Sequence, residues 1–480
     1  MIDLKKDLTL KQFLLTLSLM AFLFAMPIIL SGSYYVDDII RANTGMLGWW
    51  SLGRPISDVA VSLVSFSINT SSDVYPVTIL LACLTNILTS YILCKIFKLK
   101  YNLSSALICS LPVINPLYIQ NMMYRYDCLP MSLAIMLSVY SYYINTNKNI
   151  TSSITSIIML IVSFMLYQPA TPAFVVLAIF SYAYREQSKE NNNIIAKSAL
   201  HFATAIILYS LYTRFSVTTS RSKLVFERKD WFDFMIGNSM KLFDIYVKAY
   251  TTVFILVISA LCIYCVAKYT FAIFKNKHIN APHKWIGMIM APYPAYALIA
   301  ASILIIIIAE WPAGPRVAIP FGFFVFGVVL LTYKYTTYKS MLIIIPAYLI
   351  FYSIVSSSAV SNAYSSQIKM DYNTALMLAN DLENSNSNTG KIFVSGRTKS
   401  TDLAINNERS FPIIKSINFP ANHWIMSLIL KEYGFRNVEI NGKIKEKESM
   451  AQSACAKNIL VNKYRYEICR ANGNTYIILK

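Results

Sequence analysis

Two adjacent carboxylates, Asp37 and Asp38, follow the first long apolar stretch of the chain, in a segment that ends at Arg41. Ionisable side chains at the mouth of a membrane-spanning segment are costly to place, so they are candidates for a functional role. The apolar residues that follow as far as Trp50 are typical of a helix lying in the membrane interface. At that depth water is scarce, and the pKa of a carboxyl group rises toward values useful for a general base. The alternative is that the two acids only cap this helix and interact with its dipole.

Composition indicates the environment of these acids. The chain has 480 residues, of which 56% are hydrophobic and only 14% charged, and its mean hydropathy is +0.48. Such a composition predicts an integral membrane protein rather than a water-soluble domain. The net charge of +19 fits basic loops beside anionic membrane lipids, so we expect no nucleic-acid partner.

Apolar stretches long enough to cross a hydrocarbon core of about 30 Å recur along the chain. They predict about 11 membrane-spanning helices, near residues 12–31, 74–95, 104–120, 129–144, 151–168, 172–184, 198–215, 248–274, 285–309, 317–332 and 340–357. The first resembles a secretory signal, but the many later stretches favour an uncleaved anchor, and we expect the mature chain to start at Met1.

The short loops between these stretches are rich in Lys and Arg, which places them in the cytoplasm by the positive-inside rule. These loops are residues 95–100, 145–149, 185–193, 275–284 and 333–339. The N terminus is then inside and the C terminus outside. The predicted domains are a membrane domain at 1–357, with a first outer loop at 32–73, and a polar C-terminal domain at 358–480.

The C-terminal domain has the periodicities of a small α/β fold. The predicted elements are a helix at 367–382 and strands at 391–394, 438–440 and 475–479. Cys455 and Cys469 are its two cysteines. In an oxidising compartment they would form a disulfide, and the alternative is two unpaired buried thiols.

The predicted topology places the polar residues of interest on the outer face, at the ends of the apolar stretches or in outer loops. These residues are Asp37, Asp38, Arg41, Arg54, Asp58, Arg125, Asp127, Gln168, Arg221, Lys223, Glu310 and Arg316. None of them falls in a short cytoplasmic loop. The sequence therefore predicts a functional site on the outer face of the membrane.

Several short motifs occur along the chain in an order that resembles that of a known protein family. The motifs are the acidic pair, Gly53-Arg54-Pro55, Tyr124-Arg125-Tyr126-Asp127, Tyr167-Gln168-Pro169 and Gly314-Pro315-Arg316. Over about 300 residues the chain resembles the phage-type, serotype-converting O-antigen glucosyltransferases, which belong to the GT-C membrane glycosyltransferases. The resemblance implies a multi-pass protein of the bacterial inner membrane whose active site and C-terminal domain face the periplasm. It would transfer glucose from undecaprenyl phosphate glucose to an O-antigen repeat unit of lipopolysaccharide.

The resemblance also implies roles for residues. Asp37 or Asp38 would be the general base of an inverting transfer; we favour Asp38, with Asp37 serving hydrogen bonds or the acceptor. Arginine suits the donor phosphate, because its planar fork meets phosphate oxygens in pairs, although an Arg at the end of a span can simply reach for lipid headgroups. The expected phosphate-binding residues are Arg316, Arg125, Arg54, Arg221 and Lys223, and the expected substrate contacts are Arg41, Asp127, Gln168 and Glu310.

Two of these substrate contacts have structural alternatives, because Asp127 could form an ion pair with Arg125 and Gln168 could make an internal hydrogen bond. The four histidines lack metal-ligand spacing and no glycine-rich nucleotide loop is present, so we expect no metal and no cofactor. A companion flippase and a donor-synthesising glucosyltransferase would supply the substrate. The competing interpretations are a flippase or transporter of lipid-linked polysaccharide, an O-antigen polymerase or ligase, and another GT-C enzyme that acts on lipid A or protein.

Overall fold

The computed structural model describes residues 7–147, 149–217, 225–275, 281–308, 314–337, 343–385, 390–440, 444–456 and 458–480. The chain divides into two compact units. The helical unit comprises Met1–Ile29 and Leu47–Ser358, and the C-terminal unit comprises Leu30–Met46 and Ala359–Lys480. The segment that carries the acidic pair therefore belongs with the C-terminal residues, whereas the sequence-based division grouped all of 32–73 with the membrane domain.

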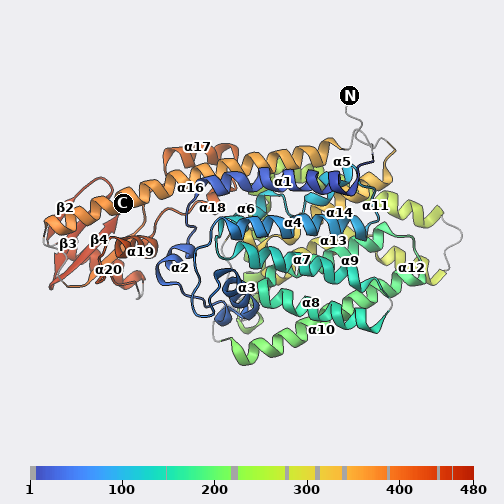
Figure 1. The fold of residues 1–480 in the computed structure, drawn as a ribbon, viewed down its shortest axis with the longest axis horizontal. Helices are drawn as coiled ribbons and strands as arrows, with labels where there is room; N and C mark the ends of the chain where they lie inside the picture. The colour runs from blue at the N-terminus through green and yellow to red at the C-terminus, as the bar shows by residue number, and fades with distance from the viewer. Residues whose placement is uncertain are drawn as a thin grey trace. The chain divides into compact units, whose positions relative to one another are not determined.

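The helical unit consists of long helices together with several short ones, joined by loops and 3₁₀ turns (Figure 1). Its helices are α1 (Leu10–Ser31), α3 (Pro55–Ser65), α4 (Val77–Ile96), α5 (Leu103–Ser110), α6 (Ile119–Met123), α7 (Cys128–Asn145), α8 (Ile150–Tyr167), α9 (Pro172–Tyr184), α10 (Lys189–Ser216), α11 (Trp231–Lys275), α12 (Ala281–Ile289), α13 (Tyr293–Ile306), α14 (Pro320–Tyr335) and the start of α16 (Ile344–Asn384). Helices α4, α7, α8 and α10 run alongside one another in Figure 1.

Buried hydroxyl groups join α7 to α8. Ser138 and Ser163 share a hydrogen bond of 2.8 Å, and Ser141 and Ser156 share one of 2.9 Å. Small side chains let two helix backbones approach closely, and their hydroxyls find partners where water is absent. This contact aligns two helices whose ends carry residues of the candidate site.

Six helices in the described part of the chain are long and apolar enough to cross a membrane: α1, α4, α8 with its 3₁₀ extension, α10, α11 and α16. The pair α12 and α13, bent by 54°, would make a seventh. The 11 predicted spans are therefore not confirmed. Helices α9 and α14 have 13 and 16 residues, or about 20 and 24 Å at 1.5 Å per residue, which is short of a 30 Å core.

The predicted span at 104–120 is broken. Helix α5 ends at Ser110, and the short 3₁₀ turn η2 (Pro116–Tyr118) and α6 follow. The Asn115 side chain accepts a hydrogen bond from the backbone N–H of Tyr118 (3.2 Å) and so starts a new turn in place of a continuing helix. The apolar composition of this segment reflects burial in protein rather than a membrane crossing.

The C-terminal unit contains a four-stranded sheet with the order β1-β4-β3-β2. The strands are β1 (Ile392–Gly396), β2 (Ile459–Asn462), β3 (Tyr466–Ala471) and β4 (Asn474–Leu479), and only β1 and β4 pair in parallel. The helices are α2 (Asp37–Thr44), α17 (Asp402–Ser410), α18 (Ile414–Ile417), α19 (His423–Glu432), α20 (Ile444–Cys455) and the end of α16.

Predictions for this unit were partly correct. The strands expected at 391–394 and 475–479 correspond to β1 and β4. The strand expected at 438–440 was wrong, because Val438 makes only an isolated bridge to Ile392. Cys455 and Cys469 form the predicted disulfide, which ties α20 to β3.

Candidate active site

Three arginines predicted to contact substrate lie in short connections of the helical unit. Arg54 directly precedes α3, Arg125 lies between α6 and α7, and Arg316 belongs to the 3₁₀ turn η6 (Pro315–Val317) before α14. Each therefore sits at a helix end, where backbone groups are available to fix its position.

Arg316 is held through its backbone. Its N–H donates to the side-chain oxygen of Gln120 (2.8 Å), and its carbonyl accepts hydrogen bonds from the Tyr167 hydroxyl (2.9 Å) and the Asn121 amide (3.2 Å). Its guanidinium lies 4.8 Å from the centroid of the Tyr124 ring, a favourable cation–π distance. Three hydrogen bonds thus fix the Arg316 backbone, and one ring contacts its guanidinium.

Gly314, two residues earlier, makes this arrangement possible. Its φ is +100°, a conformation that favours glycine, and a Cβ atom here would lie only 2.5 Å from the side-chain oxygen of Gln120. The glycine therefore lets Gln120 approach the backbone closely enough to hold Arg316.

Arg54 is held through its side chain. Its Nε donates to the Gln168 side-chain oxygen (2.6 Å), and its guanidinium lies 4.6 Å from the centroid of the Tyr167 ring. Burial lowers the pKa of Arg54, and the charge of Arg316 lowers it further while Asp127 opposes the change. An arginine keeps its charge after such a shift. The two Nη groups of Arg54 have no hydrogen-bond partner in the described parts of the protein.

The Gln168 amide is used entirely within the protein. Besides accepting from Arg54, it donates to the Leu52 carbonyl (3.0 Å) and to the Tyr209 hydroxyl oxygen (2.6 Å). The Tyr209 hydroxyl in turn donates to the Gly53 carbonyl (3.0 Å). This network fixes the backbone before Arg54 and the side chain of Arg54 together.

Tyr167, the last residue of α8, is the point where the two arginines meet. Its ring lies against the guanidinium of Arg54, and its hydroxyl binds the carbonyl of Arg316. The structure therefore brings together Arg54, Gln168 and Arg316, which are up to 262 positions apart (316 − 54). We call Arg54, Arg316 and Tyr167 the arginine cluster.

Arg125 is part of a neighbouring ion pair. Its Nη1 lies 2.7 Å from the carboxylate of Asp73, and its guanidinium lies 4.2 Å from the centroid of the Tyr75 ring. The Arg125 side chain is only 9% exposed, so a partner for its charge is required. Sequence reasoning missed Asp73, because a single acid near a helix start has no distinctive pattern.

Two further carboxylates hold the loop before Arg54. Asp127 accepts a hydrogen bond from the indole N–H of Trp49, and Asp58 accepts from the backbone N–H groups of Gly48, Trp49 and Trp50. Trp49 is 1% exposed and packs in the helical unit. The predicted interfacial helix through Trp50 is therefore too long, since α2 ends at Thr44.

The acidic pair and Arg41 lie in the C-terminal unit. Asp38 is fully buried and accepts a hydrogen bond from the Tyr35 backbone N–H (3.1 Å), while Asp37, the first residue of α2, is partly exposed. Arg41 is buried and donates to the Met46 carbonyl (3.2 Å). Val36, directly before the pair, has a φ of +47°, which is a strained conformation for a β-branched residue.

Three predicted residues, Arg221, Lys223 and Glu310, lie outside the described residues. Within the described ranges, no three His, Cys, Asp or Glu side chains are grouped as metal ligands.

The helix ends of the helical unit sort into two groups. The arginine cluster joins the end of α8 to the connection before α14. Residues in or next to three of the five loops predicted to be cytoplasmic meet elsewhere, around a hollow of about 600 Å³ lined by residues of 95–98, 143–147 and 184–194. The predicted outer and inner connections are thus separated in the folded unit.

Long apolar helices, with arginines held at the ends of several of them, define this chain as a membrane-type helical protein. A family model described as Glucosyl transferase GtrII matches residues 26–332. The match covers more than half of the chain, so the protein belongs to this family, as the motif order predicted. It includes both the acidic pair and the arginine cluster.

The chain is also similar to a phage protein described as "Uncharacterized 55.3 kDa protein in gtrB 5'region", from Salmonella phage P22. The two are 27% identical over 238 residues, which are 47% of this chain and 48% of the relative. The chain thus spans about half the length of the curated relative that it matches. No solved structure matches the chain significantly.

Proposed function

We propose that the protein is a GT-C membrane glycosyltransferase of serotype conversion. It transfers a glucosyl group from undecaprenyl phosphate glucose to an O-antigen repeat unit of lipopolysaccharide, on the periplasmic face of the bacterial inner membrane. Family membership supports glucosyl transfer, and the arrangement of Arg54 and Arg316 around Tyr167 supports an anionic donor. A companion flippase and a donor-synthesising glucosyltransferase would supply the lipid-linked sugar.

The donor phosphate is the group that needs cations. As the bond between sugar and phosphate breaks, negative charge grows on the leaving phosphate, and positive groups fixed beforehand stabilise it. Arg54 offers two Nη groups without partners in the described parts of the protein, and its Nε is already held by Gln168. Arg316 is fixed through its backbone. Arg125 ranks behind them, because Asp73 already neutralises it.

The base is proposed to be one of the acidic pair. It would take the proton of the acceptor hydroxyl while that oxygen attacks the anomeric carbon from the face opposite the phosphate. The carbon–phosphate oxygen bond breaks, its electron pair leaves with undecaprenyl phosphate, and the configuration inverts. Asp37 is partly exposed and could meet the hydroxyl directly, whereas Asp38 is enclosed and would need the segment around Tyr35 to open.

The remaining predicted contacts take two kinds of role. Gln168 and Asp127 are bonded to Arg54 and Trp49, so we assign them to positioning those residues. Arg41 and Glu310 remain candidates for contacts with the acceptor, and Arg221 and Lys223 remain candidates for the donor phosphate.

The test compares the wild type with Asp37→Asn and Asp38→Asn in a smooth host that supplies lipid-linked glucose. We expect the wild type to add a hexose to the O-antigen and one of the variants to add none while reaching the membrane at normal levels. Asp402→Asn, at an exposed position of the C-terminal unit, is the matched control. Full activity of both variants would contradict the base assignment, and a wild type that adds nothing would favour a transporter or a polymerase.

A further inference from the structure

The C-terminal unit has its own hollow, which the proposed transfer reaction does not use. It measures about 500 Å³ and is lined by Ile40 of α2, by Lys431 of α19 and by residues 436–440 beside β1. Its floor is firmly built, because Val438 is buried and the Glu439 backbone N–H donates to the Ile392 carbonyl (2.8 Å). The hollow is therefore a feature of a stable sheet edge.

The lining is strongly cationic. Three basic residues, Lys391, Lys431 and Arg436, line the hollow together with a single acid, Glu439, and the formal charge is +2 (3 − 1). Glu439 pairs with Lys391 at 3.5 Å. The Lys431 ammonium and the Arg436 guanidinium have no ion-pair or hydrogen-bond partner among the residues that the structure describes. Unmatched positive charge in a hollow favours an anion from solution.

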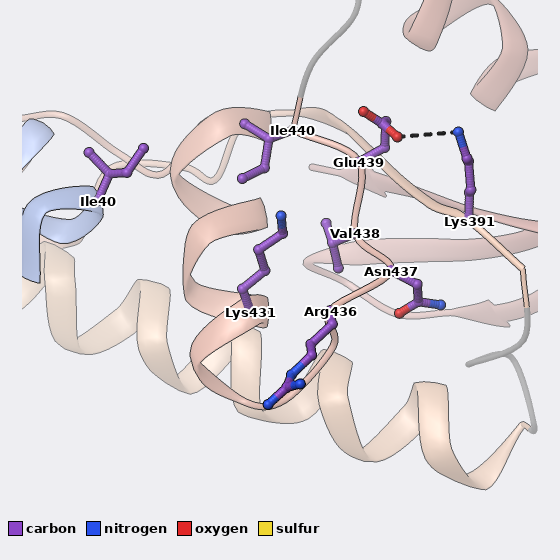
Figure 2. Close-up of a pocket in the computed structure, with 8 residues that line it drawn as sticks. All are labelled: Ile40, Lys391, Lys431, Arg436, Asn437, Val438, Glu439 and Ile440. Atoms are coloured by element: carbon purple, nitrogen blue, oxygen red, sulfur yellow. Dashed lines mark ion pairs between the residues drawn. The ribbon is translucent and has the colours of Figure 1, made fainter. Parts of the chain in front are cut away.

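Lys431 is the central cation. Figure 2 shows its side chain rising from α19 toward Ile440, with Val438 between it and the pair of Lys391 and Glu439. Arg436 starts below Val438 and extends downward, away from the pair of Lys391 and Glu439. Ile40, Val438 and Ile440 add apolar surface beside the charge, which suits the C–H faces of a sugar ring.

The hollow is coupled to the helix of the acidic pair. Ile40 lies in α2, two residues after Asp38. The Asn43 amide of the same helix donates to the Glu432 carboxylate (2.8 Å), directly after Lys431. A ligand bound beside Lys431 would therefore rest on the helix that carries the proposed base.

We propose that this hollow binds a phosphate group carried by the saccharide acceptor, with Lys431 as its main contact. The inference rests on the proposed transfer reaction and extends it to recognition of the acceptor. A net charge of +2 matches a phosphate monoester better than the single charge of a carboxylate. The apolar residues beside Lys431 favour a phosphate attached to a sugar over the free ion.

The experiment measures binding by calorimetry to the full-length protein in phosphatidylcholine nanodiscs. The probes are a phosphorylated oligosaccharide of the host lipopolysaccharide, the same oligosaccharide after enzymatic removal of phosphate, and inorganic phosphate. We expect the phosphorylated form to bind at least tenfold more tightly than either other probe. Lys431→Gln should weaken that binding about tenfold, and the exposed controls Lys369→Gln and Arg409→Gln should change it less than twofold.

The outcomes separate this inference from the proposed reaction. Arg54→Gln, in the helical unit, should lose transfer but keep wild-type binding of the phosphorylated probe. Equal binding of both oligosaccharides, equally tight binding of inorganic phosphate, or an unchanged Lys431→Gln variant would overturn the proposal. Loss of oligosaccharide binding when phosphatidylglycerol is added to the nanodiscs would also overturn it, because the hollow would then serve a lipid headgroup.

Discussion

The two units hold positive charge in contrasting ways. In the helical unit, Arg54 and Arg316 are fixed by aromatic rings and by hydrogen bonds from residues on several helices. In the C-terminal unit, Lys431 and Arg436 extend from a helix end and a loop without such restraints in the described structure. Rigid cations suit a group on which charge develops during reaction, because no energy is spent on moving them. Adjustable cations suit recognition of a variable ligand.

The first prediction concerns the rigid cations. Arg54→Gln and Arg316→Gln should each lower hexose transfer by about 10²–10³-fold, since each removes a fixed donor from the developing charge. Arg54→Lys should restore only part of the activity, because an ammonium cannot form two parallel hydrogen bonds to phosphate. Hexose incorporation in isolated membranes measures the effect. Arg214→Gln, at an exposed position of α10, is the control. Near-normal transfer by both Arg54→Gln and Arg316→Gln would contradict the role proposed here for the rigid cations.

The second prediction tests whether Gln168 acts through Arg54. Gln168→Glu keeps an oxygen for the Arg54 Nε but loses the donors to Leu52 and Tyr209. Gln168→Leu loses all three bonds. We expect transfer to fall about tenfold more in the Leu variant than in the Glu variant, at equal protein levels. Equal activities would show that the hydrogen bond to Arg54 does not matter, and that Gln168 serves only its other partners.

The third and smallest prediction concerns Asp371 in the C-terminal unit. Its carboxylate accepts hydrogen bonds from Thr398 (2.7 Å), Gln367 (3.1 Å) and the Ala421 backbone N–H (3.0 Å). Burial nevertheless raises the pKa of Asp371 to about 6. Helix α16 has 41 residues and is about 60 Å long, twice the length that a membrane crossing needs. Asp371 lies beyond the first 18 residues of this helix.

The raised pKa of Asp371 fixes the sign of the pH effect. Between pH 4 and pH 6 the Asp371 carboxyl group binds more protons in the folded protein than in the unfolded chain. Protonated Asp371 therefore stabilises the folded state at low pH, and this contribution is lost as pH rises through 6. For Asp371 alone the loss from pH 5 to pH 7.5 is about 1.4 kcal/mol. Thermal unfolding of the full chain at both values should show a smaller pH difference in Asp371→Asn than in the wild type. An identical pH difference would contradict the assignment.

Much of the local structure could be predicted from the sequence, because it depends on local patterns. Helices α1, α4 and α8 follow from apolar runs of spanning length, and the Cys455–Cys469 disulfide follows from two cysteines in one small domain. From the order of the short polar motifs we predicted that Arg54 and Arg316 both bind the donor phosphate. In the structure the Arg54 guanidinium lies over the Tyr167 ring, and the Arg316 carbonyl accepts a hydrogen bond from the Tyr167 hydroxyl.

The missed features depend on contacts between distant residues. Leu30–Met46 belongs to the C-terminal unit because Ile39 packs with Leu378 and Ile429, a partnership that no local periodicity reveals. Tyr209 could not be singled out among 33 tyrosines, and its role follows only from its bonds to Gly53 and Gln168.

The central claim is that a lipid-phosphate sugar is the donor and that the arginine cluster binds its phosphate. The most direct measurement uses the purified full-length protein in liposomes with synthetic undecaprenyl phosphate glucose and an O-antigen acceptor. We predict a glycosylated acceptor and one released undecaprenyl phosphate for each glucose transferred, with both products lost in Arg54→Gln. Transfer from a nucleotide sugar without the lipid-linked donor, or full turnover by Arg54→Gln, would contradict the account.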